Sequence, residues 1–593
     1  MKTVSYYLKK KTVRLRLVLI GAMTMVLMPV GAQNFETATE AVANMGVGWN
    51  LGNTLDAYDV SKTWTSTAQH ETCWGQPVTK PELFKMMKEA GFGAIRVPVT
   101  WFQEMDSNGK VKEAWMNRVK EVVDYVLAQD MYCIINVHHD TGADNGSFKP
   151  WIKADEANYT ENKAKYEYLW QQIAEAFKDY GDKLLFESYN EMLDKLNSWC
   201  YASYAASGQY DASVATSAYN AINGYARSFV NAVRGTGGNN VRRNLIINTY
   251  AAANGGGTWN THLKEPLTKL TIPQGEKNHI AVEVHAYPSI VNGNTNKSIS
   301  TIKSETKEMM SGLNTNFVSK GIPVIIGEWS TSNVDATQSD YDARRSLMFQ
   351  FVDDFVAQAK ALNIATFYWM GLSNGAFRSV PSFNQADLAE RIAKAYHGSS
   401  FEGKYPTADD FQTIYSVTYN SQWGELFLYG DWNSNVALKM SEYTGIRVEL
   451  DDDYSGKLQV KVYGDKIDSS NYKEQYGPLT AGSNTSTINF DTSIVGSNVY
   501  RITLQELNGE AITAKVLSAT LLKKDGSETP GKISIGWGCT LTSESIPIAG
   551  IPAVEINILH NDGAIFNLNG QQVNNPGPGI YIKNGRKYVI PRK

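Results

Sequence analysis

The sequence predicts an α/β chain, in which a (β/α)8 TIM barrel is followed by an all-β, jelly-roll-like sandwich and a short C-terminal β segment. Three observations support this prediction. Apolar strand-like runs alternate with helical stripes as far as His397, and single apolar residues alternate with polar ones beyond it. Two Asn-Gly dipeptides, which favour hairpin turns, lie near the end of the chain. A chain of 593 residues also exceeds what one core can hold, so several domains are expected.

Eight apolar runs have the length of buried strands: 46–52, 94–101, 131–138, 183–190, 244–250, 279–287, 323–329 and 364–370. Helical stripes separate most of them. Leu83, Met86, Met87 and Ala90, for example, follow the i, i+3, i+4, i+7 spacing, and Gly91 stands where that helix should end. Eight such βα units predict a barrel over residues 33–398, with its reacting groups at the carboxyl ends of the strands.

The second half of the chain has the period of two that is typical of strands. Ile446, Val448 and Leu450 alternate with polar residues, and similar runs separated by Gly, Asn and Asp turns predict a β-sandwich over 404–530. Residues 545–593 are expected to form a short β segment around the two Asn-Gly turns.

The N-terminus has the pattern of a secretory signal. Lysines and arginines precede an apolar segment that ends in small residues, so residues 1–32 are predicted to be a signal peptide cleaved before Gln33. We therefore expect a secreted protein with no membrane span after signal removal. The four cysteines are too few for a disulfide scaffold, and whether Cys73 pairs with Cys200 stays open.

Composition excludes some partners. The formal net charge of −4 with balanced signs gives no reason to expect a nucleic-acid partner. No ligand spacing suggests a metal, so neither metal nor cofactor is expected, and we expect a monomer. Aromatic residues make up 11% of the chain, which suits stacking against sugar rings as well as ordinary core packing.

Polar side chains collect where the predicted strands end. Glu191 closely follows the fourth run and Glu328 lies at the end of the seventh, so two carboxylates should face one cleft, as glycosidic-bond hydrolysis requires. One such residue alone could be structural, but a set at one rim indicates a site. The accompanying candidates for substrate binding are Asn50, Arg96, His138, His139, Asn190, His285, Tyr287 and Trp369.

Ordered motifs make this region resemble glycoside hydrolase family 5, of clan A, and its broad-specificity endo-β-1,4-glucanases. They are GWNLGNTLD at 48–56, ETCWG at 71–75, IRVPVTW at 95–101 and NVHHD at 136–140. The sequence lacks the Pro that commonly follows the Asn-Glu pair and a second Trp after Trp369. These departures leave the subfamily open.

The resemblance implies that Glu191 is the general acid/base and Glu328 the nucleophile of a retaining reaction. Arg96 would stabilise the Glu328 anion, Tyr287 would donate to Glu328, and His285 would orient Glu191. Asn190 would bind the sugar 2-OH, His138 would bind hydroxyls near the cleavage point, and Trp369 would lie under the cleaved ring. The loop aromatics Trp64, Trp74, Trp101, Trp151 and Trp259 are candidates for further stacking subsites, with packing as the alternative.

The sandwich resembles carbohydrate-binding modules, with Trp423, Trp432 and Tyr443 as candidate stacking residues; a spacer that stiffens the barrel is the alternative. The last strands resemble C-terminal sorting tails of Gram-negative surface and secreted proteins, which would place the protein on the outer membrane; a small β cap is the alternative.

We therefore expect a secreted endo-β-1,4-glucanase acting on β-1,4-linked polysaccharide. An endo-β-1,4-mannanase and a non-enzymatic glycan-capture protein are the alternatives. The presence of both Glu191 and Glu328 argues against a pure binding protein, which has no need for both.

Overall fold

The computed structural model describes residues 35–204, 209–274, 277–288, 297–331, 341–432, 436–468, 470–547, 565–566, 579–583 and 586–590. The predicted signal peptide and the Asn569-Gly570 turn lie outside these residues. The chain divides into two compact units. One unit runs to Leu372 and includes Asp387–Lys404; the other holds Ser373–Ala386 and the chain from Tyr405 onwards.

The first unit is a closed barrel of eight parallel strands in sequence order, and β1 pairs with β8 to complete the ring. All eight predicted strands are present, and seven lie within their apolar runs, whereas β5 extends three residues beyond the run 244–250. They are β1 (Val47–Asn50), β2 (Ala94–Val97), β3 (Tyr132–Asn136), β4 (Leu184–Glu187), β5 (Leu245–Ala253), β6 (Ile280–Ala286), β7 (Val324–Trp329) and β8 (Ala365–Tyr368). The TIM-barrel prediction is confirmed.

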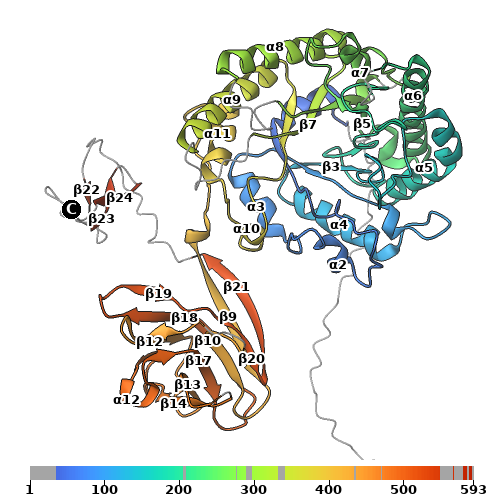
Figure 1. Cartoon of the computed structure of the whole chain (residues 1–593). Coiled ribbons are helices and arrows are strands. Elements are labelled where there is room, and N and C mark those ends of the chain that lie inside the picture. The colour runs from blue at the N-terminus through green and yellow to red at the C-terminus, as the bar shows by residue number, and fades with distance from the viewer. Residues whose placement is uncertain are drawn as a thin grey trace, which may run out of the picture. The chain divides into compact units, whose positions relative to one another are not determined.

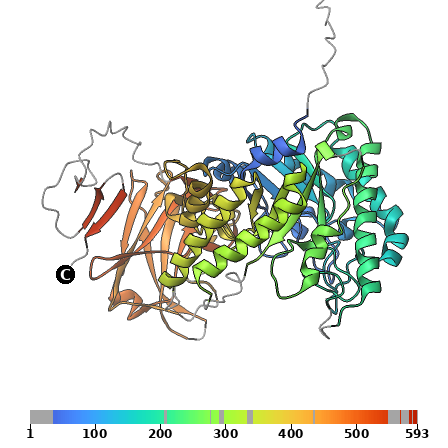
Figure 2. The same ribbon diagram turned by 90° about the horizontal axis from the view of Figure 1, so that it is seen from above.

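Helices form an outer ring around the strands (Figures 1 and 2). The helices of this unit are α1 (Ala38–Met45), α2 (Thr67–Glu71), α3 (Pro81–Glu89), α4 (Glu113–Leu127), α5 (Glu156–Ala176), α6 (Ala212–Gly235), α7 (Glu265–Thr268), α8 (Ile299–Asn316), α9 (Tyr341–Ala361) and α11 (Ala386–His397). The predicted stripe Leu83, Met86 and Met87 is buried on α3, and Gly91 follows that helix with φ 100°.

The N-terminal end of the barrel is filled by α1. Thr37 caps this helix, and its Glu40 completes a capping box. Buried Ala38, Ala41 and Met45 of α1 join one apolar cluster with residues of the strands. This packing leaves the opposite, carboxyl end of the strands for the site.

The second unit is a sandwich of two antiparallel sheets. The five-stranded sheet has the order β14-β13-β17-β10-β20 and the six-stranded sheet the order β15-β12-β18-β9-β21. The strands of the five-stranded sheet are β10 (Glu425–Tyr429), β13 (Leu458–Lys466), β14 (Tyr472–Pro478), β17 (Arg501–Glu506) and β20 (Ser534–Trp537). Five strands of the six-stranded sheet are β9 (Phe411–Tyr419), β12 (Tyr443–Leu450), β15 (Thr485–Asn489), β18 (Thr513–Lys523) and β21 (Cys539–Pro547), and the sixth is the short β19 (Glu528–Pro530), which pairs with β18 outside this order.

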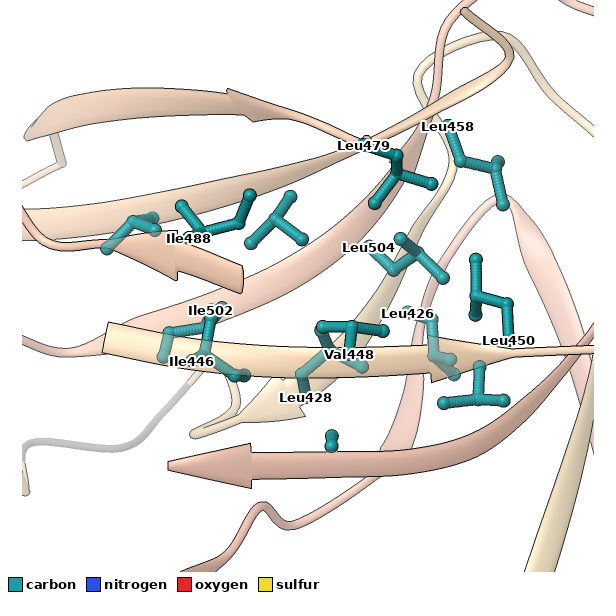
Figure 3. Packing of buried hydrophobic residues seen from close by; sticks show 14 of the residues in the cluster. Leu426, Leu428, Ile446, Val448, Leu450, Leu458, Leu479, Ile488, Ile502 and Leu504 are labelled. Atoms are coloured by element: carbon teal, nitrogen blue, oxygen red, sulfur yellow. The ribbon is translucent and has the colours of Figure 1, made fainter. Parts of the chain in front are cut away.

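Smaller elements complete this unit: α10 (Ala376–Ser379), α12 (Thr492–Val495), the pair β11 (Leu438–Lys439) and β16 (Asn498–Val499), and β19 (Glu528–Pro530), which pairs with β18. Between the two sheets the predicted inward residues Ile446, Val448 and Leu450 meet Leu426 and Leu504 in one apolar core (Figure 3). The sandwich prediction is confirmed.

Two predicted boundaries need correction. Phe401 stacks on His397 with ring centroids 4.4 Å apart, and the Lys404 amide donates to Glu89, so the barrel unit continues past residue 398. The sandwich does not end at 530, because β20 and β21 extend it to Pro547, where β21 pairs with β9. The residues before β20 are rich in turn-forming types, so the sequence pattern did not predict these two strands.

The C-terminal residues that are described form a three-stranded sheet of β22 (Ile565–Phe566), β23 (Gly579–Lys583) and β24 (Arg586–Ile590). β23 pairs with β24 from Gly579 to Lys583, and the predicted Asn-Gly turn at 584–585 lies outside the described residues. Cys73 and Cys200 are both free thiols, so the pairing left open by the sequence is absent. Among the described residues, no helix is long and apolar enough to cross a membrane.

Candidate active site

Two carboxylates lie close together at the carboxyl end of the barrel. Glu328 is part of β7, and Glu191 follows β4. One carboxylate oxygen of each, with a ring nitrogen of His285, lies within 4.8 Å of the others. Retaining glycosidases keep their two carboxyl groups about 5–5.5 Å apart, whereas inverting enzymes keep them about 6.5–9.5 Å apart to admit a water. The separation therefore fits retention.

His285, on β6, connects the two glutamates. Its Nδ1 lies 2.8 Å from Glu191 Oε1 and 3.5 Å from Glu328 Oε2, and its Nε2 lies 3.2 Å from Glu283 Oε1. Burial alone would lower the pKa of His285, but Glu328 and Glu191 raise it to about 10. The ring is therefore an imidazolium at neutral pH that donates toward both Glu191 and Glu328, which includes the predicted contact with Glu191.

Arg96, on β2, is fully buried beneath the pair. Its Nη1 donates to Glu328 Oε1 at 2.8 Å and to Asn50 Oδ1 at 3.0 Å, and its Nη2 donates to Asn190 Oδ1 at 2.9 Å. The rest of the guanidinium makes a bidentate pair with Glu187, at 2.6 and 2.8 Å. One side chain thus fixes groups from β1, β4 and β7.

Glu328 receives a second hydrogen bond from Tyr287, whose hydroxyl donates to Oε2 at 2.6 Å. The enclosure of that hydroxyl and the nearby charge of Glu328 raise the pKa of Tyr287, which keeps it a donor. Burial raises the pKa of Glu328, while His285, Arg96 and Tyr287 act in the opposite direction. The predicted stabilisation of the anion by Arg96 is thus present, but it works against burial.

Beneath this layer lies a second pair of carboxyl groups, Glu187 of β4 and Glu283 of β6, both fully buried. Burial would raise the pKa of Glu187, but Arg96 holds it below its usual range. Burial and the Glu187 charge raise the pKa of Glu283 to about 8. Glu283 therefore keeps its proton to a higher pH than an ordinary carboxyl group does.

The Glu283 carboxyl group fits in this place only because the residue before Glu328 is a glycine, Gly327. A Cβ built on Gly327 would lie 1.8 Å from Glu283 Oε1, the atom that contacts His285. Only glycine lets the two neighbouring strands hold this carboxyl group and Glu328 together.

The histidines at the end of β3 are neutral. The backbone N–H of Val99 donates to Asn136 Oδ1, which orients the Asn136 side chain. Its amide NH₂ therefore donates to His138 Nδ1 at 3.0 Å, so the proton of the neutral His138 ring is on Nε2. That Nε2 lies 4.0 Å from Glu328 Oε1. Burial lowers the pKa of His138 well below its usual value and that of His139 to about 4.

The remaining predicted residues surround the pair. Asn50 donates to the Gly327 carbonyl at 2.8 Å, and half-buried Trp369 lies over Gly52 with its ring parallel to that of His138. His139 Nε2 lies 3.8 Å from Asp56 Oδ2. Every barrel residue predicted for the site therefore lies at this end of the barrel, as strand-end positions require.

Sequence reasoning assigned no role to Glu283 or Asn136. The available signal was strand period: Glu283 lies two residues before His285, and Asn136 two before His138, so each pair shares a face. Among the loop aromatics, Trp101 is wrong as an exposed subsite. It is fully buried and donates to the Asn136 carbonyl, whereas Trp74 and Trp259 are exposed.

Comparison with known proteins identifies the chain. Residues 58–375 match the model of the cellulase family, glycosyl hydrolase family 5. Endoglucanase A of Clostridium longisporum is 34% identical over 404 residues, which cover 64% of this chain and 70% of that protein. A broad-specificity endoglucanase structure from an uncultured bacterium is 84% identical, with a TM-score of 0.59, covering 61% of this chain and 96% of that one.

A family 5 enzyme from Prevotella bryantii, solved with a xyloglucan tetradecasaccharide, is 40% identical with a TM-score of 0.54, covering 61% of this chain and 99% of that one. The fold and the paired carboxylates define a glycoside hydrolase of the retaining clan A type. The chain belongs to glycoside hydrolase family 5, as an endo-β-1,4-glucanase. The alternative of a non-enzymatic glycan-capture protein is excluded by this membership.

Proposed function

We propose that the protein cleaves β-1,4-linked glucans by double displacement, with Glu328 as the nucleophile and Glu191 as the general acid/base. The main observation in support is the cluster of Glu191, His285 and Glu328, in which one side-chain oxygen or nitrogen atom of each residue lies within 4.8 Å of the others. Glu328 attacks the anomeric carbon while Glu191 protonates the departing oxygen. Glu191 then takes a proton from the water that releases the sugar from Glu328.

The surrounding groups support this division of roles. Glu328 accepts from Arg96 and Tyr287, which suits an attacking anion that must also leave again. Glu191 has His285 as its partner and is less buried than Glu328, which suits a group that exchanges protons with the leaving oxygen and with water. Asn190, held at its Oδ1 by Arg96, keeps its amide NH₂ to donate to a sugar hydroxyl.

We infer a broad glucan specificity that includes xyloglucan, because the solved relatives include broad-specificity endoglucanases and an enzyme with bound xyloglucan. An endo-β-1,4-mannanase is the second candidate, because the same residues at the barrel rim would serve either sugar. Reducing-sugar release from a soluble cellulose derivative, lichenan, xyloglucan and mannan tests this: the first three should be cleaved. Faster cleavage of mannan than of any glucan would contradict the inference.

The roles are tested by rescue. Glu328→Ala should abolish turnover, and azide should restore it with formation of the α-glycosyl azide, because a small anion fills the emptied nucleophile space. Glu191→Ala should spare activated aryl glycosides, whose leaving groups need no proton. Glu305→Ala, which changes an exposed glutamate on α8, is the matched control. A β-glycosyl azide from Glu328→Ala would reverse the two assignments.

We also propose secretion, followed by retention at the outer surface of a Gram-negative cell through the C-terminal strands. The support is the sequence pattern of residues 1–32 and the similarity of the last strands to sorting tails. Mass spectrometry of the mature protein should find Gln33 at its N-terminus, and fractionation of the producing cells should find it outside the cytoplasm. A mature chain that retains residues 1–32 would contradict the first part.

A further inference from the structure

The outer face of the five-stranded sheet carries a set of side chains that the barrel reaction does not use. Leu426, Val460 and Leu504 point into the core of the sandwich, so the alternate residues of β10, β13 and β17 point outward. The outer face is defined by Glu425, Phe427, Lys461, Tyr463, Glu474, Tyr476, Arg501, Thr503, Gln505 and Trp537.

Exposed aromatic rings lie at both edges of this outer face. Trp537 on β20 pairs with Glu425, and Tyr476 on β14 pairs with Lys461; their exposed fractions are 53% and 52%. Four strand spacings separate the two edge strands, roughly 19 Å. Between them Trp432 lies edge-on to Phe427 at 4.9 Å and is itself exposed.

Polar groups fill the space between the rings. Tyr463 donates to Glu425 at 2.6 Å, Gln505 donates to the same carboxylate at 2.8 Å, and Lys461 Nζ lies 3.9 Å from it. Arg501 is only 8% exposed, yet its Nε has no hydrogen-bond partner, nor has Thr503 Oγ1. Buried, incompletely paired polar groups on the outside of a sheet cost free energy, so a spacer alone gives no reason for them.

We propose that this outer face is a second binding site for the protein's polysaccharide, a neutral β-1,4-linked glucan chain. Flat rings at intervals suit the apolar C–H faces of sugar rings, and the amide, ammonium and carboxylate groups between them suit sugar hydroxyls. Lys461 and Arg501 balance Glu425 and Glu474, so the face offers no net charge to a nucleic acid or other polyanion. The charged groups at its centre also disfavour a protein partner.

The identity of the glycan rests on the proposed function, whereas the location rests on the sheet. This location differs from the sequence-based one. Trp432 is retained, but Tyr443 is half-buried and packs against the sandwich core, and Trp423 lies in the turn before β10. The binding roles of Trp423 and Tyr443 stay predictions, and a Trp423→Ala variant in the experiment separates Trp423 from the outer face.

The test uses the full-length chain with Glu328→Gln, so that bound polysaccharide is not cleaved. Sedimentation with swollen amorphous cellulose and electrophoresis in gels containing xyloglucan measure binding. Trp537→Ala and Tyr476→Ala should each weaken binding at least about fivefold, the loss expected for a ring that contributes substantially to binding. Tyr168→Ala, which removes an exposed ring from α5 of the barrel, is the matched control and should bind as the parent does.

Separate outcomes have separate meanings. Unchanged binding by both sheet variants, an equal loss in Tyr168→Ala, or a loss confined to Trp423→Ala would overturn the proposal. Equal urea midpoints across the variants show that folding is intact. When the same substitutions are made in the chain that keeps Glu328, all variants should hydrolyse a short aryl cello-oligosaccharide equally fast. If the chain with Glu328 cleaves no glucan, the proposed function is refuted, but the binding comparison can still be interpreted.

Discussion

Among the described glycines, Gly327 is the one at which the added methyl group of an alanine substitution would make the shortest contact. The new Cβ would lie 1.8 Å from Glu283 Oε1 and 2.3 Å from its Cδ, whereas ordinary contact begins near 3.4 Å. The Glu283 carboxyl group must therefore move by about 1.6 Å, the difference between 3.4 and 1.8 Å. That movement removes Oε1 from His285 Nε2, now at 3.2 Å, and from Arg96 Nε, now at 3.4 Å.

The cost follows from these contacts. Overpacking a core costs about 1–3 kcal/mol, and losing a hydrogen bond to a charged group costs about 1.5–3 kcal/mol. We expect Gly327→Ala to lower the free energy of unfolding by about 2.5–6 kcal/mol. Because His285 would lose the partner that fixes its ring, Glu191 should lose its orientation, and kcat/KM on soluble glucan should fall more than about tenfold.

A double-mutant cycle with Glu283→Ala isolates the clash, measured by urea unfolding and by kcat/KM. In the Glu283→Ala background the methyl group has room, so Gly327→Ala should cost less than about 1 kcal/mol. Gly235→Ala, at the open C-terminal end of α6, is the matched control and should be neutral or slightly stabilising. An equal cost of Gly327→Ala in both backgrounds would refute the reasoning.

Three further outcomes are expected. Proton NMR of the first product should show the β-anomer, because two displacements restore the configuration; an initial α-anomer would mean inversion. Dialysis against EDTA should leave kcat unchanged even though Asp56, His138 and His139 lie within reach of a common ion, because the proposed steps use only carboxylates; lost activity restored by a divalent metal would contradict this. The stability supplied by the His285 imidazolium is present in full below its ordinary pKa of 6.5 and is lost as pH rises toward about 10, so Tm should fall over that range, and less steeply in His285→Asn; parallel curves would contradict the assignment.

The barrel was predictable because each βα unit has a local pattern. Every predicted strand has its own apolar run, and stripes such as Leu83, Met86 and Met87 fix the buried face of a helix. Glu191 and Glu328 were predictable because they stand where apolar strands end. Strand period and position along the strand could not predict the buried contacts below the two glutamates. Glu187 lies on the same strand face as Glu191, and only the three-dimensional structure shows that Arg96 binds Glu187 through two hydrogen bonds.

The sandwich shows the complementary limit. Alternation predicts which residues are inward, and Ile446, Val448 and Leu450 are indeed in the core. It does not predict which strands are neighbours, so it could not place Trp537 and Tyr476 on the same outer face. It also missed the short strand β20, which has only four residues and contains Gly536, a residue type that is depleted in strands.

Arg96 also bears on how the chain assembles. Its partners come from β1, β4, β6 and β7, so its set of polar partners is complete only when the ring of strands is nearly complete. A nascent chain released as far as β5 could pair Arg96 with Glu187 but would have neither Glu283 nor Glu328 to offer. An incomplete barrel therefore holds a poorly satisfied guanidinium in its interior, which disfavours stable half-barrels. The residues that would break a glycosidic bond thus also favour all-or-none closure of the domain that carries them.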